Sequence, residues 1–359
     1  RLGHNLRMEV AGDAHNIAND QASGKNGLKV KVKRFVPPYL WQSLKDRSRL
    51  KLDEANFHQY GRIMDEFKPD VIYERAAWMG NAAASAGKKR GIPHFLEVNA
   101  PLLEEKLKLE HSGIYDRKGA IMEKELYAFV NWITVVSSTL RNILVDRFKV
   151  DPEKILILPN AIDPDRFVAP SKDSISMLRK ELGLKDSVVL GFVGSIFPYH
   201  GVDELINVVS EVHRNGQNVS LVIVGDGYIV PELKEQSERL KAPVVFTGNV
   251  PRSAVADYIS LFDIGVVPKG GYYMSPIKLF EYGAMGVPVL AFNTEPIRDV
   301  LLHEANGVLF DDSESMKQGI VALLNEDLRR TLGERFKEEV HKEHTWFKNT
   351  ERIVKFMHP

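Results

Sequence analysis

A lysine and a glutamate in the stretch MSPIKLFEYGAMGVPVLAFN, residues 274–293, are spaced to share one face of a short helix. Ser275 is a good N-cap residue and Pro276 is a good first helical residue. The free N–H groups at the start of such a helix, together with the charge of Lys278, predict a seat for phosphate. Glu281, three residues later, can accept two hydrogen bonds from a vicinal diol such as a ribose. The stretch therefore predicts a site for a nucleoside diphosphate, and the alternative is an ordinary surface lysine–glutamate pair.

A second stretch, LGFVGSIFPYHGVDELI at 190–206, has the pattern strand, glycine, loop, glycine and helix. Gly194 allows a ligand to approach the backbone closely, and the helix after Gly201 presents its N-terminus. His200 can donate a hydrogen bond to a phosphate oxygen there, although a lone histidine is as often structural. This stretch predicts a second seat for an anion.

Three charged residues in the first half fall at or just inside predicted strand ends. Glu74 ends the run DVIYE (70–74), Arg75 follows it, and Glu97 lies in HFLEVN (94–99). Open α/β sheets bind ligands outside the carboxyl ends of their strands. We expect Glu97 or Glu74 to orient a substrate hydroxyl, unless one or both only pair with Arg75.

The elements that must position these residues alternate along the chain. Short apolar runs separated by amphipathic helical stretches are typical of parallel sheets with helices on both faces. Uninterrupted apolar runs predict strands that are buried on both faces. Besides the two runs just named, the predicted strands are WITVVSS (132–138), ILILPN (155–160), VVLGFVGS (188–195), LVIVGDG (221–227), VVFTG (244–248), IGVVP (264–268), PVLAF (288–292) and GVLF (307–310).

The length of 359 residues suits two packed domains with a cleft between them, because single cores rarely grow past about 250–300 residues. Prolines, aspartates and serines in NAIDPDRFVAPSKDS (160–174) indicate a hinge. The opening RLGHNLRMEVAG reads as a helix end followed by a second strand, so we expect the first strand to be missing.

Composition excludes several classes of function. Formal net charge is +0, with 48 basic and 48 acidic residues, so no global field recruits nucleic acid. The absence of cysteine excludes disulfides and thiolate metal sites. No apolar run approaches the roughly 18–20 residues of a spanning helix, and we expect a cytoplasmic protein. No G-x-G-x-x-G follows a strand with an acidic residue about 20 positions on, which argues against a dehydrogenase.

Two patterns that resemble metal motifs are expected to be incidental. Asp163-Pro164-Asp165 lies in the predicted linker and is expected to be a solvated turn. His341 and His344 have no accompanying carboxylate constellation. We predict no metal requirement.

Residues 25–51 hold nine Lys or Arg and one Asp, interleaved with aromatic and apolar side chains. Such a patch suits an anionic membrane surface or a phosphorylated acceptor. The alternative is a solvated strand-and-loop face.

Taken together, these stretches resemble the retaining glycosyltransferases of family 4, which have the GT-B fold of two facing Rossmann-like, doubly wound α/β domains. The resemblance covers almost the whole chain. It is carried by ILILPNAIDPDRF (155–167), VIVGDG (222–227), FTGNVP (246–251), FDIGVVP (262–268) and PVLAF (288–292), and a subset of the family also has stretches similar to YER, EVNAPL, HGV and SPIKLFEY.

The resemblance implies an acceptor-binding domain over 1–167, a nucleotide-sugar-binding domain over 168–340, and a final helix over 341–359 that crosses back to the first domain. It also implies roles for individual residues. Donor-binding residues would be Gly194, Ser195, His200, Gly225, Val250, Ser275, Pro276, Ile277, Lys278 and Glu281; acceptor-binding residues would be Glu74, Arg75, Glu97 and Asn99; and the catalytic set would be Lys278, Glu281, Asn99 and His200.

The sequence departs from the family pattern at several of these positions. The family has two glutamates eight positions apart, and Glu281 matches the second while Tyr273 replaces the first. Ser195 and His200 align with a phosphate-binding arginine and lysine, which leaves Lys278 as the clearest phosphate cation. Asn99 aligns with the usual active-site histidine; it cannot act as a base, but it can hydrogen-bond the reacting sugar.

The resemblance implies a retaining transfer of a hexose from a nucleoside diphosphate sugar, carrying UDP or GDP, to an acceptor hydroxyl, with no cofactor. One alternative is a sugar-nucleotide epimerase of the same fold. The other is a protein that binds nucleotide sugar without turnover.

Overall fold

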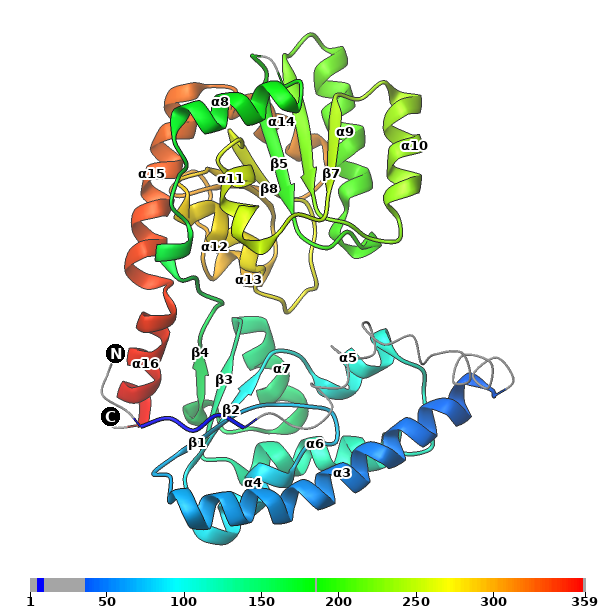
Figure 1. Cartoon of the computed structure of the whole chain (residues 1–359), viewed down its shortest axis with the longest axis vertical. Helices are drawn as coiled ribbons and strands as arrows, with labels where there is room; N and C mark the ends of the chain where they lie inside the picture. The colour runs from blue at the N-terminus through cyan, green and yellow to red at the C-terminus, as the bar shows by residue number, and fades with distance from the viewer. Residues whose placement is uncertain (1–4, 10–35, 185, 358–359) are drawn as a thin grey trace. The chain divides into compact units, whose positions relative to one another are not determined.

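The computed structural model describes residues 5–9, 36–184 and 186–357. The chain divides into two compact units, one of residues 1–135 with 140–156 and the other of 136–139 with 157–359 (Figure 1). The domain boundaries predicted after residues 167 and 340, and the cleft between the domains, stay predictions. Most of the predicted missing-strand region lies outside the described residues.

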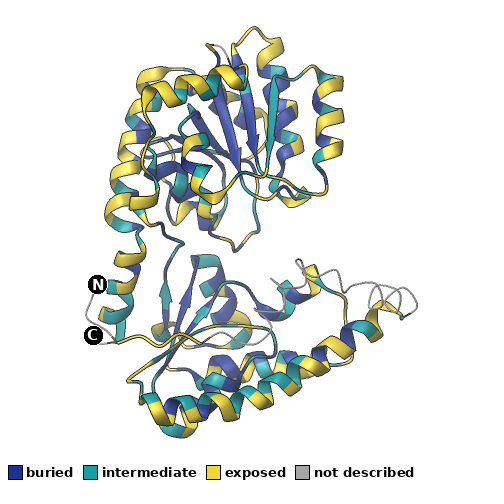
Figure 2. Ribbon diagram, viewed as in Figure 1, coloured by how far each residue is buried: buried dark blue, intermediate teal, exposed yellow. Residues whose placement is uncertain are grey.

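The second unit contains a parallel sheet whose strands follow the order β10-β9-β8-β5-β6-β7. All of its strands were predicted from apolar runs, because most of them are buried on both faces, whereas the edge strand β7 is partly buried (Figure 2). The described bounds are β5(Val188–Val193), β6(Val219–Val224), β7(Val244–Gly248), β8(Ile264–Val267), β9(Val289–Phe292) and β10(Val308–Phe310).

Helices cover both faces of this sheet and build two hydrophobic cores. One core joins α9, α10 and α14 to the strands, and the other joins α11, α12 and the second half of α15 through Phe336 and Val340. This doubly wound arrangement confirms the predicted fold class for this unit. The helices are α8(Lys172–Glu181), α9(Val202–Arg214), α10(Val230–Leu240), α11(Val255–Ile259), α12(Ile277–Ala284), α13(Glu295–Arg298), α14(Ser313–Ala322), α15(Glu326–Glu343) and α16(Trp346–Met357).

The strand order reverses between β5 and β8. After β5 the chain proceeds to β6 and β7 on one side, and it then returns to place β8 against the other side of β5. In open α/β sheets ligands bind outside the carboxyl ends of the strands at such a reversal. The topology therefore places the candidate site where the segments that follow β5 and β8 meet.

The first unit has a parallel sheet of order β1-β2-β3-β4. The described strands are β1(Ile72–Arg75), β2(His94–Val98), β3(Trp132–Val135) and β4(Ile155–Ile157), and all four were predicted. The helices of this part of the chain are α3(Pro38–Phe67), α4(Ala82–Arg90), α5(Leu102–Leu109), α6(Asp116–Phe129) and α7(Ser138–Phe148). Within the described ranges, no helix combines the length and apolar character needed to cross a bilayer.

Candidate active site

The predicted phosphate helix is α12, and it begins one residue later than expected. Its N-cap is Pro276 and its first residue is Ile277, so the prediction that Ser275 caps the helix and Pro276 opens it was wrong. The reason is a competing contact. The buried Ser275 hydroxyl accepts a hydrogen bond from the backbone N–H of Asn160 at 3.1 Å, and the Asn160 side chain donates to the Ser275 carbonyl at 2.6 Å.

Asn160 was missed as a site residue by sequence reasoning. Its two hydrogen bonds fix the chain just before α12 to the segment that follows β4. The available signal was its place in the stretch 155–167, where an asparagine after a proline precedes the predicted hinge. Its role is to position the start of α12.

The ammonium of Lys278 lies at the reversal of strand order. Its Nζ is 3.8 Å from the centre of the Phe192 ring on β5, a cation–π contact. A Cβ atom added to Gly194, directly after β5, would lie 3.2 Å from the same Nζ. The predicted residues Lys278 and Gly194 are therefore brought together by β5 and α12.

Burial gives this ammonium an unusual electrostatic state. Enclosure of the Lys278 side chain lowers its pKa from 10.5 to about 7, against the opposing effect of Glu281. Within the part of the chain that the structure describes, no carboxylate lies within ion-pair distance of Lys278. A cation whose opposite charge, Glu281, lies beyond ion-pair distance can bind an anionic ligand.

His200 stands beside this lysine in the loop after β5. Burial, and then the positive charge of Lys278, lower the pKa of His200 to about 4, so its imidazole is neutral at pH 7. Its buried Nδ1 has no hydrogen-bond partner in the described residues. A neutral imidazole can still donate one hydrogen bond, which keeps the predicted phosphate contact chemically feasible.

Glu281 lies one turn further along α12. Burial raises its pKa, while the charges of Lys278 and of Arg252 lower it. Arg252 follows β7 at the start of a short 3₁₀ turn, and it was not predicted. Glu281 thus lies within electrostatic reach of both Lys278 and Arg252.

The loops after β5 and β6 are joined by an approach that only glycine permits. Gly225 has φ +131°, and a Cβ there would lie 2.0 Å from the Gly194 carbonyl oxygen. The N–H of Gly194 donates to the Val224 carbonyl, and the N–H of Ile196 donates to the Asp226 carbonyl, both at 2.9 Å. The predicted Gly225 therefore holds the anion-facing loop in its conformation.

The remaining predicted donor residues differ in how far they are exposed to solvent. Ser195 is exposed in the loop after β5, and Ile277 is exposed at the start of α12. Val250, after β7, is partly buried against the second core. Lys269 was not predicted, although it lies next to the start of α9: a Cβ added to Gly201 would be 3.0 Å from the Cβ of Lys269.

In the first unit, the predicted acceptor residues divide between the two faces of the sheet. Glu97 accepts hydrogen bonds from the Asn99 side chain at 2.7 Å and from the Tyr73 hydroxyl at 2.9 Å, and Arg75 lies 3.6 Å away. Tyr73 was not predicted; the strand's alternation places it beside Arg75 on one face. Glu97, Asn99 and Arg75 are therefore brought together.

Glu74 points to the opposite face. Its carboxylate lies 3.0 Å from Nε2 of the buried His94, one strand away. This contact separates Glu74 from Glu97 and favours a structural role for it.

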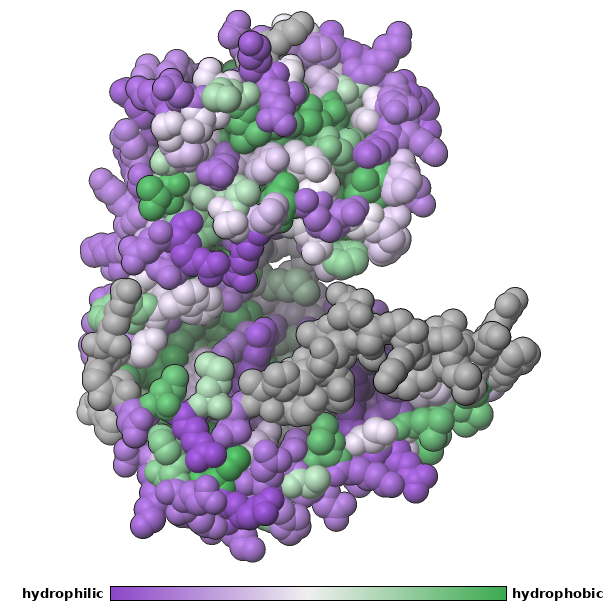
Figure 3. Space-filling model, viewed as in Figure 1, coloured by the Kyte–Doolittle hydropathy of each residue, from purple (hydrophilic) through white to green (hydrophobic). Residues whose placement is uncertain are grey.

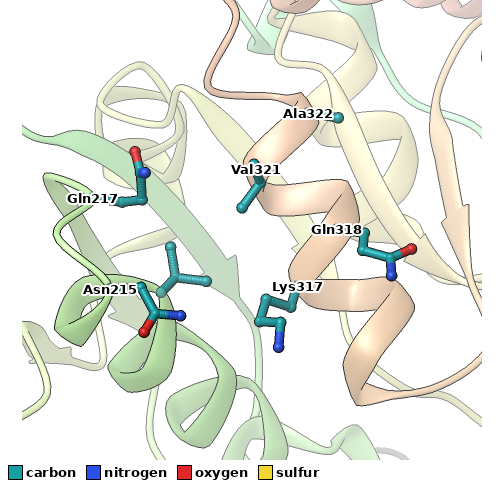
Figure 4. Close-up of a pocket in the computed structure, with 7 residues that line it drawn as sticks. Asn215, Gln217, Lys317, Gln318, Val321 and Ala322 are labelled. Atoms are coloured by element: carbon teal, nitrogen blue, oxygen red, sulfur yellow. The ribbon is translucent and has the colours of Figure 1, made fainter.

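A surface hollow of the second unit is lined by none of these residues. It encloses about 370 Å³ between the end of α9 and α14, and Figure 4 shows its lining of apolar and amide side chains. The ammonium of Lys317 at its rim is paired with Glu211 at 2.9 Å and with Glu314 at 2.6 Å. None of its lining residues was predicted to bind substrate.

The two patterns that resemble metal motifs lie in an exposed turn and in contacts with other protein groups. Asp163 and Asp165 are exposed at a 3₁₀ turn. His341 contacts the Ala284 carbonyl at 3.1 Å, whereas His344 lies 3.8 Å from Glu339. In the described ranges, no group of three or more His, Asp or Glu side chains is arranged to hold a metal. The absence of a metal requirement stays a prediction.

Known families match both halves of the chain. Residues 3–166 match the model described as Glycosyltransferase Family 4, and residues 187–326 match the model described as Glycosyl transferases group 1. The chain is a glycosyltransferase. The subfamily suggested by its motifs, and the retaining stereochemistry, stay predictions.

Curated relatives of this glycosyltransferase are distant. An uncharacterized glycosyltransferase of Methanocaldococcus jannaschii is 23% identical over 300 residues, which is 80% of this chain and 74% of the relative. The D-inositol 3-phosphate glycosyltransferase of Stackebrandtia nassauensis is 27% identical over 238 residues, covering 62% of this chain and 52% of the relative. The chain thus spans about half the length of the second relative.

Solved structures establish the GT-B fold of this glycosyltransferase. Anabaena HepE in complex with UDP superposes with a TM-score of 0.72 at 17% identity, over 86% of this chain and 82% of that one. The sucrose-phosphate synthase of Thermosynechococcus elongatus superposes with a TM-score of 0.65 at 18% identity, over 86% of this chain and 78% of that one. These likenesses confirm two Rossmann-like parallel-sheet domains.

Replacing Lys278 with methionine is expected to stabilise the ligand-free protein. The folded-state pKa of about 7 lies below the ordinary 10.5, so the unfolded chain binds more protons between these values. Wild-type stability should therefore rise as pH rises from about 7 toward 10, while Lys278→Met lacks this gain. Allowing for partial solvation, the variant should be more stable by about 2–4 kcal/mol at pH 7, and by less near pH 9.5.

Urea unfolding at the two pH values measures this difference. Lys337→Met, at an exposed lysine beside the other end of α12, is the matched control, with an expected change within about 0.5 kcal/mol. A destabilised Lys278→Met, or a stabilisation independent of pH, would contradict the assigned charge state.

Proposed function

We propose that the protein transfers a hexose from a UDP- or GDP-sugar to an acceptor hydroxyl with retention of anomeric configuration. The observation that carries the proposal is the ammonium of Lys278 at the reversal of strand order. In the described residues it has no carboxylate within ion-pair distance, and it lies beside the partly buried Gly194. A diphosphate supplies the counter-charge that this position lacks.

The nucleotide is assigned along the carboxyl edge of the second sheet. The diphosphate lies over the end of β5 at Gly194 and Lys278, with Ser195, His200 and the start of α12 at Ser275–Ile277 close by. Glu281 accepts hydrogen bonds from the ribose diol. Gly225 and Val250, after β6 and β7, flank the base.

Charge stabilisation is the main catalytic contribution in this proposal. The bond between the sugar's anomeric carbon and the diphosphate oxygen breaks, and the negative charge that develops on that oxygen is stabilised by Lys278. The acceptor oxygen bonds to the same face of the anomeric carbon. Its proton passes to the departing diphosphate, so no protein base, cofactor or metal is needed.

The acceptor is assigned to the first unit. The carboxylate of Glu97 orients the reacting hydroxyl, and Asn99 and Arg75 hold Glu97 and the acceptor sugar in place. Glu74 has its own partner in His94 and is left out of this role.

Proteins with the same fold support the choice of donor. HepE structures are described as complexes with UDP, with UDP and glucose, and with UDP-glucose. Curated relatives are named as glycosyltransferases, which does not favour an epimerase. A cytoplasmic location is part of the proposal, as is peripheral membrane contact through residues 25–51. Of that segment, 25–35 lie outside the described residues.

Nucleotide binding tests the proposed function. We expect UDP or GDP at about 100 times its dissociation constant to stabilise the protein by about 2.7 kcal/mol in a thermal-shift screen. Lys278→Met should lose this stabilisation, whereas Lys337→Met should keep it. The matching nucleotide sugar should be consumed only with an acceptor present. Conversion without an acceptor would favour the epimerase, and binding without any turnover would favour the non-catalytic alternative.

A 2′-deoxyribose donor tests the role of Glu281. Glu281→Ala deletes a charged acceptor for the ribose hydroxyls, so donor binding should weaken by about 1.5–3 kcal/mol and appear mainly in KM. Wild type should discriminate against the deoxy donor, and Glu281→Ala should discriminate less, because the hydroxyl's partner is already absent. Equal discrimination by both proteins would show that Glu281 does not bind the ribose hydroxyls.

A further inference from the structure

Three aromatic side chains lie together on the loops that follow β5 and β6, and no step of the proposed function uses them. Phe197 and Tyr199 belong to the loop after β5, and Tyr228 belongs to the loop after β6. The ring of Phe197 is stacked on that of Tyr199, with centroids 5.5 Å apart and planes inclined by 15°. Its centroid also lies 6.1 Å from that of Tyr228. We call these three residues the aromatic platform.

The two tyrosines of the platform are open to solvent. Tyr199 keeps 47% of its surface accessible and Tyr228 keeps 72%. In the described part of the chain, neither phenol hydroxyl has a hydrogen-bond partner. Tyrosine offers a large, stiff and amphipathic contact surface, since its ring turns about only two bonds. A ligand can therefore pack on the ring faces and hydrogen-bond the hydroxyls.

Backbone contacts between the two loops fix the platform in place. Ile196 precedes Phe197, and Gly227 precedes Tyr228. The N–H of Ile196 donates to the Asp226 carbonyl at 2.9 Å, and a Cβ added to Gly227 would lie 1.8 Å from the Ile196 carbonyl oxygen. Such a close approach requires glycine, so the two loops are locked together beside the platform. Preorganisation of this kind reduces the entropy lost on binding.

A series of ring contacts connects the platform to the site of Lys278. The ring of Tyr199 lies 4.4 Å from that of His200, between centroids, and the His200 ring lies 5.8 Å from that of Phe192. Phe192 in turn carries the Lys278 ammonium over its face at 3.8 Å. The aromatic platform is therefore continuous with the position assigned to the diphosphate.

From these observations we propose that the aromatic platform binds a hexopyranose ring taking part in the transfer reaction. One face of a pyranose ring gathers C–H groups that pack on the negative face of an aromatic ring, and its hydroxyls can hydrogen-bond the phenols. The inference rests on the proposed function, because it takes the hexose to lie next to the diphosphate. The ring can belong to the donor or to the acceptor, and the two arms of the test separate these sources.

The size of the platform favours a small ligand. Surfaces that bind another protein or a membrane are usually contiguous apolar patches of more than a few hundred Å². On the face of the second unit drawn in Figure 3, hydrophobic areas are interrupted by hydrophilic residues. A cluster of three rings with polar tips matches a single sugar ring instead.

Sugar binding by the full chain tests the platform in two arms. For the acceptor, saturation-transfer NMR measures methyl glycosides of glucose, galactose, mannose and N-acetylglucosamine with UDP or GDP bound. For the donor, calorimetry compares the nucleotide sugars with UDP and GDP alone. In one of these arms, Tyr199→Ala and Tyr228→Ala should each weaken sugar binding about fivefold. Tyr199→Phe and Tyr228→Phe should stay within about twofold of wild type, because they keep the ring face.

An aromatic residue elsewhere in the second unit provides the matched control. Phe347 on α16 is 45% exposed, and Phe347→Ala should bind sugars like wild type. All variants should retain wild-type thermal stability and affinity for UDP or GDP alone.

Three results would overturn the proposal. The first is that UDP or GDP binds while neither arm shows sugar binding that depends on the platform; this result leaves the proposed function intact. The second is an equal loss of affinity for the nucleotide alone, which would assign the platform to the nucleobase. The third is failure of wild type to bind either nucleotide, which would contradict the proposed function as well.

Discussion

The enclosed ammonium of Lys278 is the interaction around which the second unit is organised. Its position over Phe192 and beside Gly194 takes it largely out of water, and the charge of Glu281, beyond ion-pair distance, offsets that loss only in part. The resulting fall in its pKa to about 7 is a cost to the free protein. Such a cost is expected where a charge is kept ready for a ligand, since preorganised charge inside a site acts more strongly than charge in water.

The surrounding backbone fixes the position of the Lys278 ammonium. Gly225 and Gly194 allow the loops after β5 and β6 to touch, and Asn160 fixes the residues before α12 by holding Ser275. His200 stays neutral beside Lys278, which avoids a second buried charge of the same sign. The fold thus contributes through strand order and close backbone packing, which bring residues 194 and 278 together although 84 positions separate them in the numbering.

The sequence allowed the strands, the anion-facing loop and Lys278 to be predicted, because buried apolar runs and glycines reflect local requirements. Contacts between distant segments were not predictable. Ser275 was taken for a helix cap, since nothing local shows that Asn160 claims its hydroxyl. Glu74 and Glu97 looked equivalent at strand ends, yet they lie on opposite faces because their register differs by one position. No local sequence pattern marked Lys269, Arg252 or Tyr73 as site residues. Their positions near the site follow only from strand order and register.

Proton uptake on donor binding tests the central claim most directly. The diphosphate of a nucleotide sugar is esterified at both ends and does not titrate near neutrality, so it makes a clean titrant. Calorimetry at about pH 8, in two buffers of different ionisation enthalpy, should show uptake approaching one proton per bound nucleotide sugar, because the anion restores the charge of Lys278. Uptake should be close to zero at about pH 6, and also in Lys278→Arg at both pH values. Binding at pH 8 without proton uptake by the wild-type protein would contradict the account.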